Sequence, residues 1–377
     1  MKLTDVYIVM ENRIVFGDLV IDNDTIISIV EKDNTTQRPA KFVVPGFIDL
    51  HTHGAGSYDA MDANPQAIEE FALSLVREGT TGFLATTMTQ TIQNITTALS
   101  NISSYMNNQN RNSSIVLGIH LEGPFIHEKA AGAQPINCIT KANTNTFNIF
   151  EIASNNQIKK VSLAPDNPAS LDLITYLNQK GIIASIAHTK ATYNDVHLAI
   201  KAGAKSVTHM YNAMTPLHHR DIGVVGAALL HDELSAELIL DKVHVSIPAV
   251  KLLLKNKGLS GVIVITDSMR AKYMPEGEYD LGGQVTIVKQ GEARLSDGTL
   301  AGSILKMNEA YKYLIQDFNL SLSEASVLCS LNAAKQLGIE KSVGSIAPFK
   351  KANLVVLNES FEVLQTIING HLVYEVE

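Results

Sequence analysis

Five short apolar runs in this chain each lead into a histidine or a carboxylate residue, and this recurrence constrains the fold more than any other feature. The runs are typical of buried strands, and the residues that close them are His51 with His53, Glu122, His188, His209 and Asp267. In a parallel (β/α) barrel the strands all point the same way, so residues at their carboxyl ends converge on one cleft. The pattern therefore predicts such a barrel, with a polar site at one end.

The spacing of the apolar runs agrees with this prediction. Helical patterns lie between them and end at glycine, as in 68–78 before Gly79 and 193–202 before Gly203. Strand candidates fall near residues 43, 81, 115, 160, 182, 205, 236 and 262. This alternation predicts an α/β protein with a (β/α)8 TIM-type barrel over residues 43–342.

Both ends of the chain have patterns typical of β-strands. Residues 3–30 alternate apolar and polar side chains, and β-type patterning returns after a helical stretch at 323–337. We therefore expect residues 1–42 and 343–377 to pair into a small β-sandwich domain beside the barrel. A third region, 269–303, is rich in glycine and turn residues, and we expect it to form a hairpin or lid over the cleft.

His51 and His53 are two residues apart at the end of a predicted strand, so both imidazoles would project from one face. Alone, the pair fits exposed histidines in a turn equally well, but the other strand-end residues favour a metal site. Imidazole and carboxylate ligands suit Zn²⁺ and also Fe²⁺, Mn²⁺ or Co²⁺. Such a metal lowers the pKa of bound water towards ~7. With Asp267 as the proton shuttle, these groups favour hydrolysis of a C–N bond.

The composition excludes several other classes of protein. The net charge of −8 argues against general affinity for nucleic acid, and Cys138 and Cys329 are too few for a disulfide framework. The longest apolar run, 222–230, is far below the ~18 residues of a membrane span, and the first residues lack a signal-peptide pattern. We expect a cytoplasmic protein without nucleic-acid or membrane partners. Neither a Gly-x-Ser-x-Gly elbow nor a P-loop is present.

The strand-end motifs resemble those of the amidohydrolase superfamily and, within it, the family of N-acetylglucosamine-6-phosphate deacetylases. The motifs are Pro45-Gly-Phe-Ile-Asp-Leu-His-Thr-His-Gly, His120-Leu-Glu-Gly-Pro-Phe, Ala187-His-Thr, Thr208-His-Met-Tyr-Asn-Ala-Met and Thr266-Asp-Ser-Met. The resemblance covers essentially the whole chain. It implies hydrolysis of the N-acetyl group of N-acetyl-D-glucosamine 6-phosphate to D-glucosamine 6-phosphate and acetate. Amino-sugar catabolism or cell-wall sugar recycling is the implied context.

The resemblance also implies a role for individual residues. Asp267 matches the catalytic general acid/base, and Glu122, His188 and His209 match the principal metal ligands. His51 and His53 match an additional pair found in members that hold a second metal, so one or two divalent ions are expected. Arg220 matches an arginine that reaches the phosphate in the neighbouring subunit, which implies a homodimer. The positions that match substrate-binding residues are Ala133, Gln134, Asn212, Ala213, Arg220, His244, Leu300, Ala301 and Gly302.

One departure and two alternatives qualify this expectation. Many members have histidine where this chain has Gln134, and an amide can donate a hydrogen bond but carries no charge. A first alternative is another amidohydrolase, such as a cyclic amidase or a purine deaminase, which would not depend on a substrate phosphate. A second is an inactive barrel that acts as a scaffold, which need hold no metal.

Overall fold

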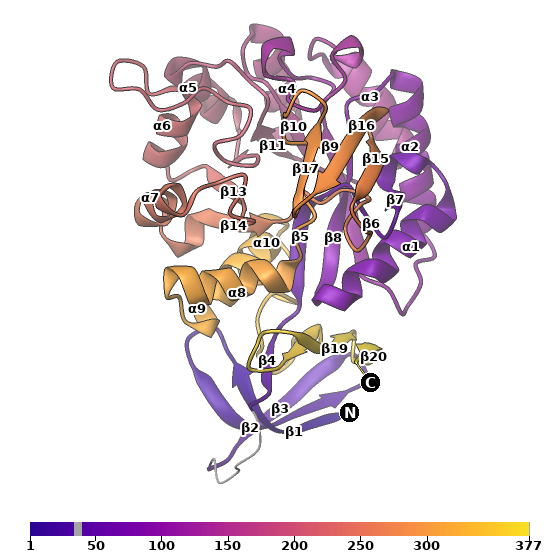
Figure 1. The fold of residues 1–377 in the computed structure, drawn as a ribbon, viewed down its shortest axis with the longest axis vertical. Coiled ribbons are helices and arrows are strands. Elements are labelled where there is room, and N and C mark those ends of the chain that lie inside the picture. The colour runs from indigo at the N-terminus through magenta and orange to yellow at the C-terminus, as the bar shows by residue number, and fades with distance from the viewer. Residues whose placement is uncertain (34–39, 377) are drawn as a thin grey trace.

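The computed structural model describes residues 1–33 and 40–376. Eight parallel strands form one sheet in the order β14-β13-β12-β11-β10-β9-β8-β5, which curves into a nearly closed barrel and confirms the predicted fold (Figure 1). The strands are β5 (Phe47–Thr52), β8 (Thr80–Thr87), β9 (Ile115–Glu122), β10 (Ile158–Leu163), β11 (Ile183–Ile186), β12 (Ser206–Val207), β13 (Ser235–Ile239) and β14 (Val262–Ile265).

The barrel closes where residues that follow β14 bond to β5. Thr266 Oγ1 donates to Asp49 Oδ2 at 2.6 Å, and the Asp267 N–H donates to the His51 carbonyl oxygen at 2.8 Å. These contacts bring the last barrel strand against the first. Asp267 and the His51/His53 pair therefore meet because the barrel closes.

Helices alternate with the strands, as predicted. They are α1 (Pro65–Leu75), α2 (Ile92–Met106), α3 (Thr144–Ala153), α4 (Pro168–Gln179), α5 (Tyr193–Ala202), α6 (Gly223–Leu230) and α7 (Ile247–Lys257), followed by α8 (Met307–Phe318), α9 (Leu322–Ser326) and α10 (Asn332–Gln336). Helix α5 has the expected bounds because a capping box of Thr192 and Asp195 starts it and Gly203, at φ 113°, ends it. Helix α1 begins and ends three residues earlier than the expected 68–78, since residues Val76–Glu78 form a 3₁₀ turn before Gly79.

Both termini contribute to a seven-stranded sheet beside the barrel, in the order β20-β19-β18-β4-β1-β2-β3 (Figure 1). The strands are β1 (Lys2–Val9), β2 (Ile14–Asp22), β3 (Thr25–Glu31), β4 (Phe42–Pro45), β18 (Leu354–Leu357), β19 (Val363–Ile368) and β20 (His371–Glu375). They share a core of their own that includes Ile8, Leu19 and Ile367. The domain boundaries at 42/43 and 342/343 stay a prediction.

The apolar run at residues 42–52, which we expected to form one barrel strand, contributes to both sheets. β4 pairs with β1 and β18 in the small sheet, whereas β5 pairs with β8 in the barrel. Gly46 lies between them, where a Cβ atom would come within 2.3 Å of Thr81 Oγ1. Glycine therefore permits the close approach at which the chain passes from one sheet to the other.

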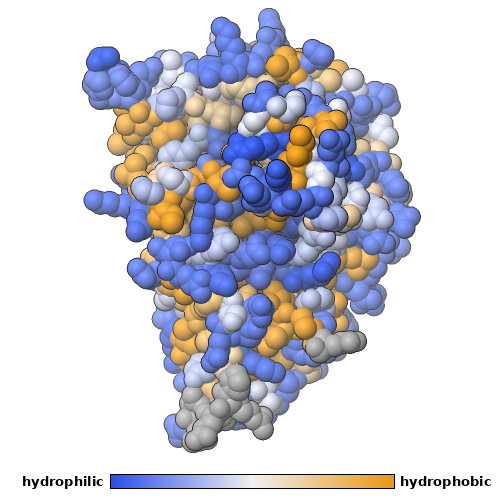
Figure 2. Space-filling model, viewed as in Figure 1, coloured by the Kyte–Doolittle hydropathy of each residue, from blue (hydrophilic) through white to orange (hydrophobic). Residues whose placement is uncertain are grey.

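Residues 269–303 contain a three-stranded antiparallel sheet, β15 (Gly277–Leu281), β16 (Gln284–Lys289) and β17 (Glu292–Leu295), drawn in orange in Figure 1. Gln284 Nε2 donates to the Ala133 carbonyl oxygen at 2.6 Å, which ties this sheet to the loop after β9. Hydrophilic residues cover much of the face in Figure 2, and apolar residues form scattered groups. Within residues 1–33 and 40–376, we find no helix with the length and apolar character needed to cross a membrane.

Candidate functional site

A cavity of about 500 Å³ lies at the carboxyl ends of the barrel strands. Its walls come from loops that follow the strands and from the β15–β17 sheet. The predicted site residues that line it are His53, Glu122, Ala133, Gln134, His188, His209, Asn212, Ala213, His244, Asp267, Leu300 and Gly302. The strand-end pattern predicted five of these residues, His53, Glu122, His188, His209 and Asp267, and the family resemblance supplied the others.

Three predicted residues do not line the cavity. His51 is fully buried below it, and Ala301 is buried behind the wall to which its neighbours belong. Arg220 lies on an exposed loop, where Nη1 is 2.7 Å from His219 Nε2. Arg220 therefore does not contribute to the cavity of its own subunit.

Four imidazole Nε2 atoms surround the carboxylate of Glu122 at the base of the cavity. Glu122 Oε1 is 3.3 Å from His209 and 3.4 Å from both His188 and His51, while Oε2 is 3.3 Å from His53. Two groups of potential metal ligands result, each with its ligand atoms within 4.8 Å of one another: His51, His53 and Asp267, and Glu122, His188 and His209. The Glu122 carboxylate lies between the two histidine pairs, as a bridging ligand would.

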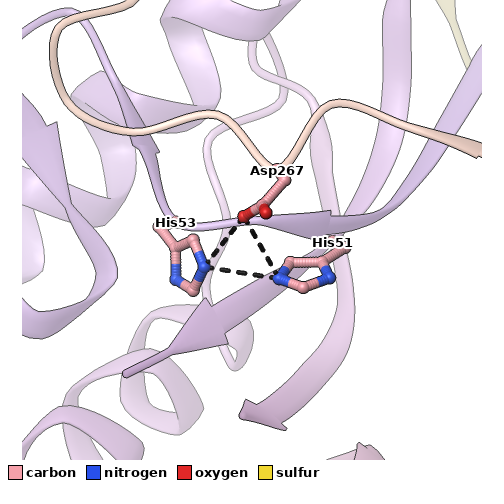
Figure 3. Close-up of side chains that lie close together, drawn as sticks. All are labelled: His51, His53 and Asp267. Atoms are coloured by element: carbon pink, nitrogen blue, oxygen red, sulfur yellow. Dashed lines mark hydrogen bonds and ion pairs between the residues drawn. The ribbon is translucent and has the colours of Figure 1, made fainter. Parts of the chain in front are cut away.

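Figure 3 shows the first group. His51 in β5 and His53, which directly follows the last residue of that strand, project to the same side, and Asp267 points towards them from the loop after β14. Asp267 Oδ1 is 3.2 Å from His53 Nε2 and 3.3 Å from His51 Nε2. The i, i+2 spacing thus has the consequence expected from strand geometry.

The other ring nitrogen of three of these histidines contacts an oxygen that can only accept. His51 Nδ1 donates to Glu237 Oε2 at 3.3 Å, His53 Nδ1 to the Thr86 carbonyl at 3.2 Å, and His188 Nδ1 to the Ala130 carbonyl at 2.9 Å. These contacts hold a proton on Nδ1, so Nε2, which faces the cluster, is the nitrogen that a metal would bind in place of a proton. Metal-binding histidines are oriented in this way.

Three of the converging residues have left-handed backbone conformations. His188, His209 and Asp267 have φ angles of 42°, 31° and 50°. Such conformations are uncommon outside glycine and cost free energy, so they persist where the surrounding structure holds them. Here the strained residues are the ones whose side chains turn into the cluster.

Burial and mutual charge shift the pKa values in the cluster. Burial alone would raise the pKa of Glu122, but His51, His188 and His209 lower it well below its usual range. Burial opposes protonation of His53, yet the carboxylates of Asp267 and Glu122 raise its pKa to about 9. The pKa of Asp267 is lowered, because His51 and His53 outweigh its burial. Both carboxylates are therefore ionised at neutral pH.

The donor set fits a divalent metal. His188 Nε2 and His209 Nε2 are 3.0 Å apart and face the same carboxylate oxygen, an arrangement that a shared cation would stabilise. Imidazole nitrogen and carboxylate oxygen match the ligand preference of Zn²⁺ and its neighbours in the first transition series. Two neighbouring groups of potential ligands, with no residue in common, thus lie at the base of the cavity.

Glu237 and Lys160 belong to the site but were not predicted. Lys160 Nζ forms an ion pair with Glu237 Oε1, and Glu237 Oε2 accepts from His51, all in fully buried positions. The sequence carries a signal for Glu237, a carboxylate between Ala236 and Leu238 in a short strand, whereas Lys160 follows the exposed Lys159 and reads as a second surface lysine. The pairing joins residues 77 positions apart, and a single sequence gives no means to deduce it.

Gln134, the departure from the common histidine, is buried at the edge of the cluster. Its Oε1 accepts from the Thr89 N–H at 2.8 Å, so its Nε2 must face the other way. There it donates to Glu122 Oε2 at 2.7 Å. Gln134 thus orients the carboxylate that lies between the two histidine pairs.

The upper part of the cavity carries positive charge. Lys129, Lys190 and Arg294 line it together with His244. Burial would lower the pKa of His244, but the Asp241 carboxylate, 2.6 Å from His244 Nδ1, raises it. The cavity therefore combines potential metal ligands with cationic groups in its lining, which suits a small substrate that carries a negative group.

Comparison with known proteins agrees with this geometry. Residues 42–373 match the model of the Amidohydrolase family. The N-acetylglucosamine-6-phosphate deacetylase of Bacillus subtilis (strain 168) is 42% identical over 382 residues, which span 99% of this chain and 96% of the relative.

Solved structures give the same result. The N-acetylglucosamine-6-phosphate deacetylase of Thermotoga maritima has a TM-score of 0.92 at 33% identity and covers all of both chains. A mutant of the Mycobacterium smegmatis enzyme in complex with N-acetyl-D-glucosamine-6-phosphate has a TM-score of 0.93 at 27% identity, over 99% of each chain. This chain belongs to the amidohydrolase family and, within it, to the N-acetylglucosamine-6-phosphate deacetylases.

Proposed function

We propose that this protein hydrolyses the acetamide of N-acetyl-D-glucosamine 6-phosphate, with the residues of the buried cluster in the roles given below. The observation that carries the proposal is the position of Asp267, whose carboxylate lies 3.2 and 3.3 Å from the two imidazoles of the His51/His53 pair. A proton-transfer group is thus next to the metal ligands at the base of the cavity.

Glu122, His188 and His209 would hold one divalent ion, and His51 and His53 would help to hold a second. Zn²⁺, Fe²⁺, Mn²⁺ and Co²⁺ all suit this donor set. When bound, a metal of this kind polarises a carbonyl group and lowers the pKa of water. The second ring nitrogens, held by Glu237, Thr86 and Ala130, keep the ligand nitrogens in place.

Asp267 moves the proton. Its lowered pKa leaves it ionised at neutral pH, so it can accept a proton from the attacking water. The water oxygen bonds to the acetyl carbon, the C–N bond breaks, and Asp267 returns the proton to the departing amine. The products are acetate and the amino sugar phosphate, and Asp267 is restored.

The cavity walls would bind the sugar phosphate. Ala133, Ala213, Leu300 and Gly302 lie along the walls, while Asn212 provides an amide and His244 an imidazole. Gln134 serves the reaction through Glu122, because its amide already contacts that carboxylate and the Thr89 N–H. Its contribution is therefore to position Glu122 rather than to carry charge.

We also propose a homodimer in which Arg220 reaches the phosphate in the neighbouring subunit. Arg220 is exposed and absent from the walls of its own cavity, and Leu217 on the same loop is 52% exposed. A loop of this kind suits contact with a second chain. Mixing the inactive variants Asp267→Asn and Arg220→Ala should restore partial activity through hybrid sites, and the absence of recovery despite subunit exchange would contradict the dimer.

The free state of Cys138 and Cys329 suits the reducing cytoplasm, where we place the enzyme. The test of the function is acetate release by purified, metal-reconstituted protein. The protein should release acetate from N-acetylglucosamine 6-phosphate, and a chelator should stop this release. The unphosphorylated sugar should react poorly, and N-acetylgalactosamine 6-phosphate measures the tolerance for other sugar phosphates. No turnover of any phosphorylated sugar by metal-loaded protein would sink the proposal.

A further inference from the structure

The β15–β17 sheet forms one wall of the cavity, and its contacts tie it to the reaction centre. Leu281, Arg294 and the loop at 299–302 contribute to the lining. The Ser303 N–H donates to the Asp267 carbonyl at 2.7 Å, and the Ala301 N–H donates to the Ala293 carbonyl at 3.0 Å. A residue on β17 therefore has a fixed place relative to Asp267.

Arg294 is the cationic residue on this wall, and most of its freedom is already lost. Its Nε donates to Glu292 Oε2 at 2.6 Å, and its Nη1 donates to the Gly298 carbonyl at 2.7 Å. Its Nη2 has no hydrogen-bond partner among residues 1–33 and 40–376. A guanidinium held in this way loses little further entropy when it binds a ligand.

His244 is a second cationic group that lines the same cavity. Asp241 raises its pKa, and the nearby charge of Arg294 opposes that rise. Two positive groups from different elements, β17 and the loop after β13, thus share one part of the cavity. An anion placed between them would relieve their repulsion, and phosphate oxygens match the planar donors of arginine.

We propose that Arg294 binds the 6-phosphate of the substrate from within the same subunit and sets the preference for phosphorylated over unphosphorylated sugars. This proposal rests on the proposed function. It adds a phosphate ligand to the residues expected from the family, and unlike Arg220 this one lies in the cavity of its own chain. Lys129 and Lys190 also line the cavity, but both are exposed and make no ion pair within the described residues, so they attract anions without fixing their position.

The rival explanation is that Arg294 only stabilises the turn at 295–299. Its bond to Gly298 lies beside the hydrogen bond from the Leu295 N–H to the Thr299 carbonyl, at 2.8 Å. A purely structural role would affect phosphorylated and unphosphorylated substrates alike. The two explanations therefore differ in substrate preference.

The experiment compares Arg294→Gln and Arg294→Lys in the full-length, metal-loaded enzyme. Kinetics are measured with N-acetylglucosamine 6-phosphate and with N-acetylglucosamine, and inhibition is measured with inorganic phosphate. Arg13→Gln is the matched control, because Arg13 is an exposed arginine paired with Glu31 in the small β domain. Thermal unfolding reports whether each variant is folded.

We expect Arg294→Gln to raise KM for the phosphorylated sugar roughly tenfold to a hundredfold, the range for a hydrogen bond to a charged group. The kcat/KM for the unphosphorylated sugar should stay the same, inhibition by inorganic phosphate should weaken in parallel, and Arg294→Lys should recover part of the loss. An equal loss for both sugars, or no loss for either, would overturn the proposal. If the wild-type enzyme turned over no phosphorylated sugar, the proposed function would fail, yet weaker phosphate binding by Arg294→Gln would still support an anion site at Arg294.

Discussion

Two buried Lys–Glu ion pairs in this protein have the same chemistry but different neighbours. Lys160 pairs with Glu237 below the metal-ligand cluster, and Lys272 pairs with Glu78 outside it, with all four side chains fully buried. Glu78 also accepts from the hydroxyls of Thr80 and Tyr273, whereas Glu237 uses its second oxygen to hold His51. One pair therefore supports the fold alone, and the other also orients a predicted metal ligand.

The difference shows that burial and charge do not by themselves identify a functional ion pair. What distinguishes Glu237 is the imidazole on its far side, whose other nitrogen lies 3.3 Å from Asp267. A chain of contacts thus runs from Lys160 through Glu237 and His51 to the proposed proton shuttle. Substitutions in this series of contacts, and at His244 outside it, should therefore have different effects.

The largest effect is expected at Asp267, the last residue in this series of contacts. Asp267→Asn keeps the ion pair and the histidines but removes the group that transfers the proton. Turnover should fall by at least ~10², the range for general acid/base catalysis, with bound metal and KM little changed. Metal analysis beside steady-state kinetics measures both. Near-normal turnover would exclude the role given to Asp267.

The next prediction separates the two ion pairs. Glu237→Gln and Glu78→Gln each leave a buried lysine without its partner, so each should lower the free energy of unfolding by about 3–5 kcal/mol. Only Glu237→Gln should also weaken metal affinity, by about 10- to 100-fold, because His51 loses the carboxylate that orients it. Competition with a chelator measures the metal affinity, and unfolding by denaturant measures the free energy of unfolding. Equal metal affinity in both variants would remove the distinction.

A double substitution sharpens this result. Replacing a buried ion pair by apolar residues often restores stability. The double variants Lys272→Met/Glu78→Met and Lys160→Met/Glu237→Met should therefore both have a higher free energy of unfolding than the single variants. Metal affinity should stay at the wild-type value in the first double variant and remain weakened in the second. Recovery of affinity in the second would mean that charge balance, rather than orientation of His51, governs the metal site.

The smallest effect is expected at His244, which lines the cavity but makes no contact with the ion pair. The Asp241 carboxylate raises the pKa of His244, so its positive charge persists to higher pH than that of an ordinary histidine and is lost as the pH rises through that pKa. A phosphate monoester is a dianion above about pH 6. Affinity for the substrate should therefore weaken as the pH rises, by up to about tenfold, while the charges of Asp241, Asp267 and Arg294 stay constant.

His244→Gln provides the control for this prediction. An amide does not titrate, so the alkaline rise in KM should disappear in the variant and KM should be high throughout. A rise that persists unchanged in His244→Gln would assign the titration to another group.

The barrel and the reaction centre were predictable because both follow from local patterns. Alternation places His51 and His53 on one face, and strand ends place Glu122, His188 and Asp267 at one end of the barrel. The division of residues 42–52 between two sheets was not predictable, because the apolar run continues from β4 into β5 and only the distant partners of each strand distinguish them. The pairing of Lys160 with Glu237 and the place of Arg294 on the wall also depend on contacts across the sequence.

The most direct test of the central claim is a metal titration of the metal-free protein, with bound metal per subunit and acetate release from N-acetylglucosamine 6-phosphate measured on the same samples. We predict no turnover without metal, and a rise that follows the bound metal and ends at one or two ions per subunit. Turnover that persists in metal-free protein, or full metal binding without acetate release, would contradict the account.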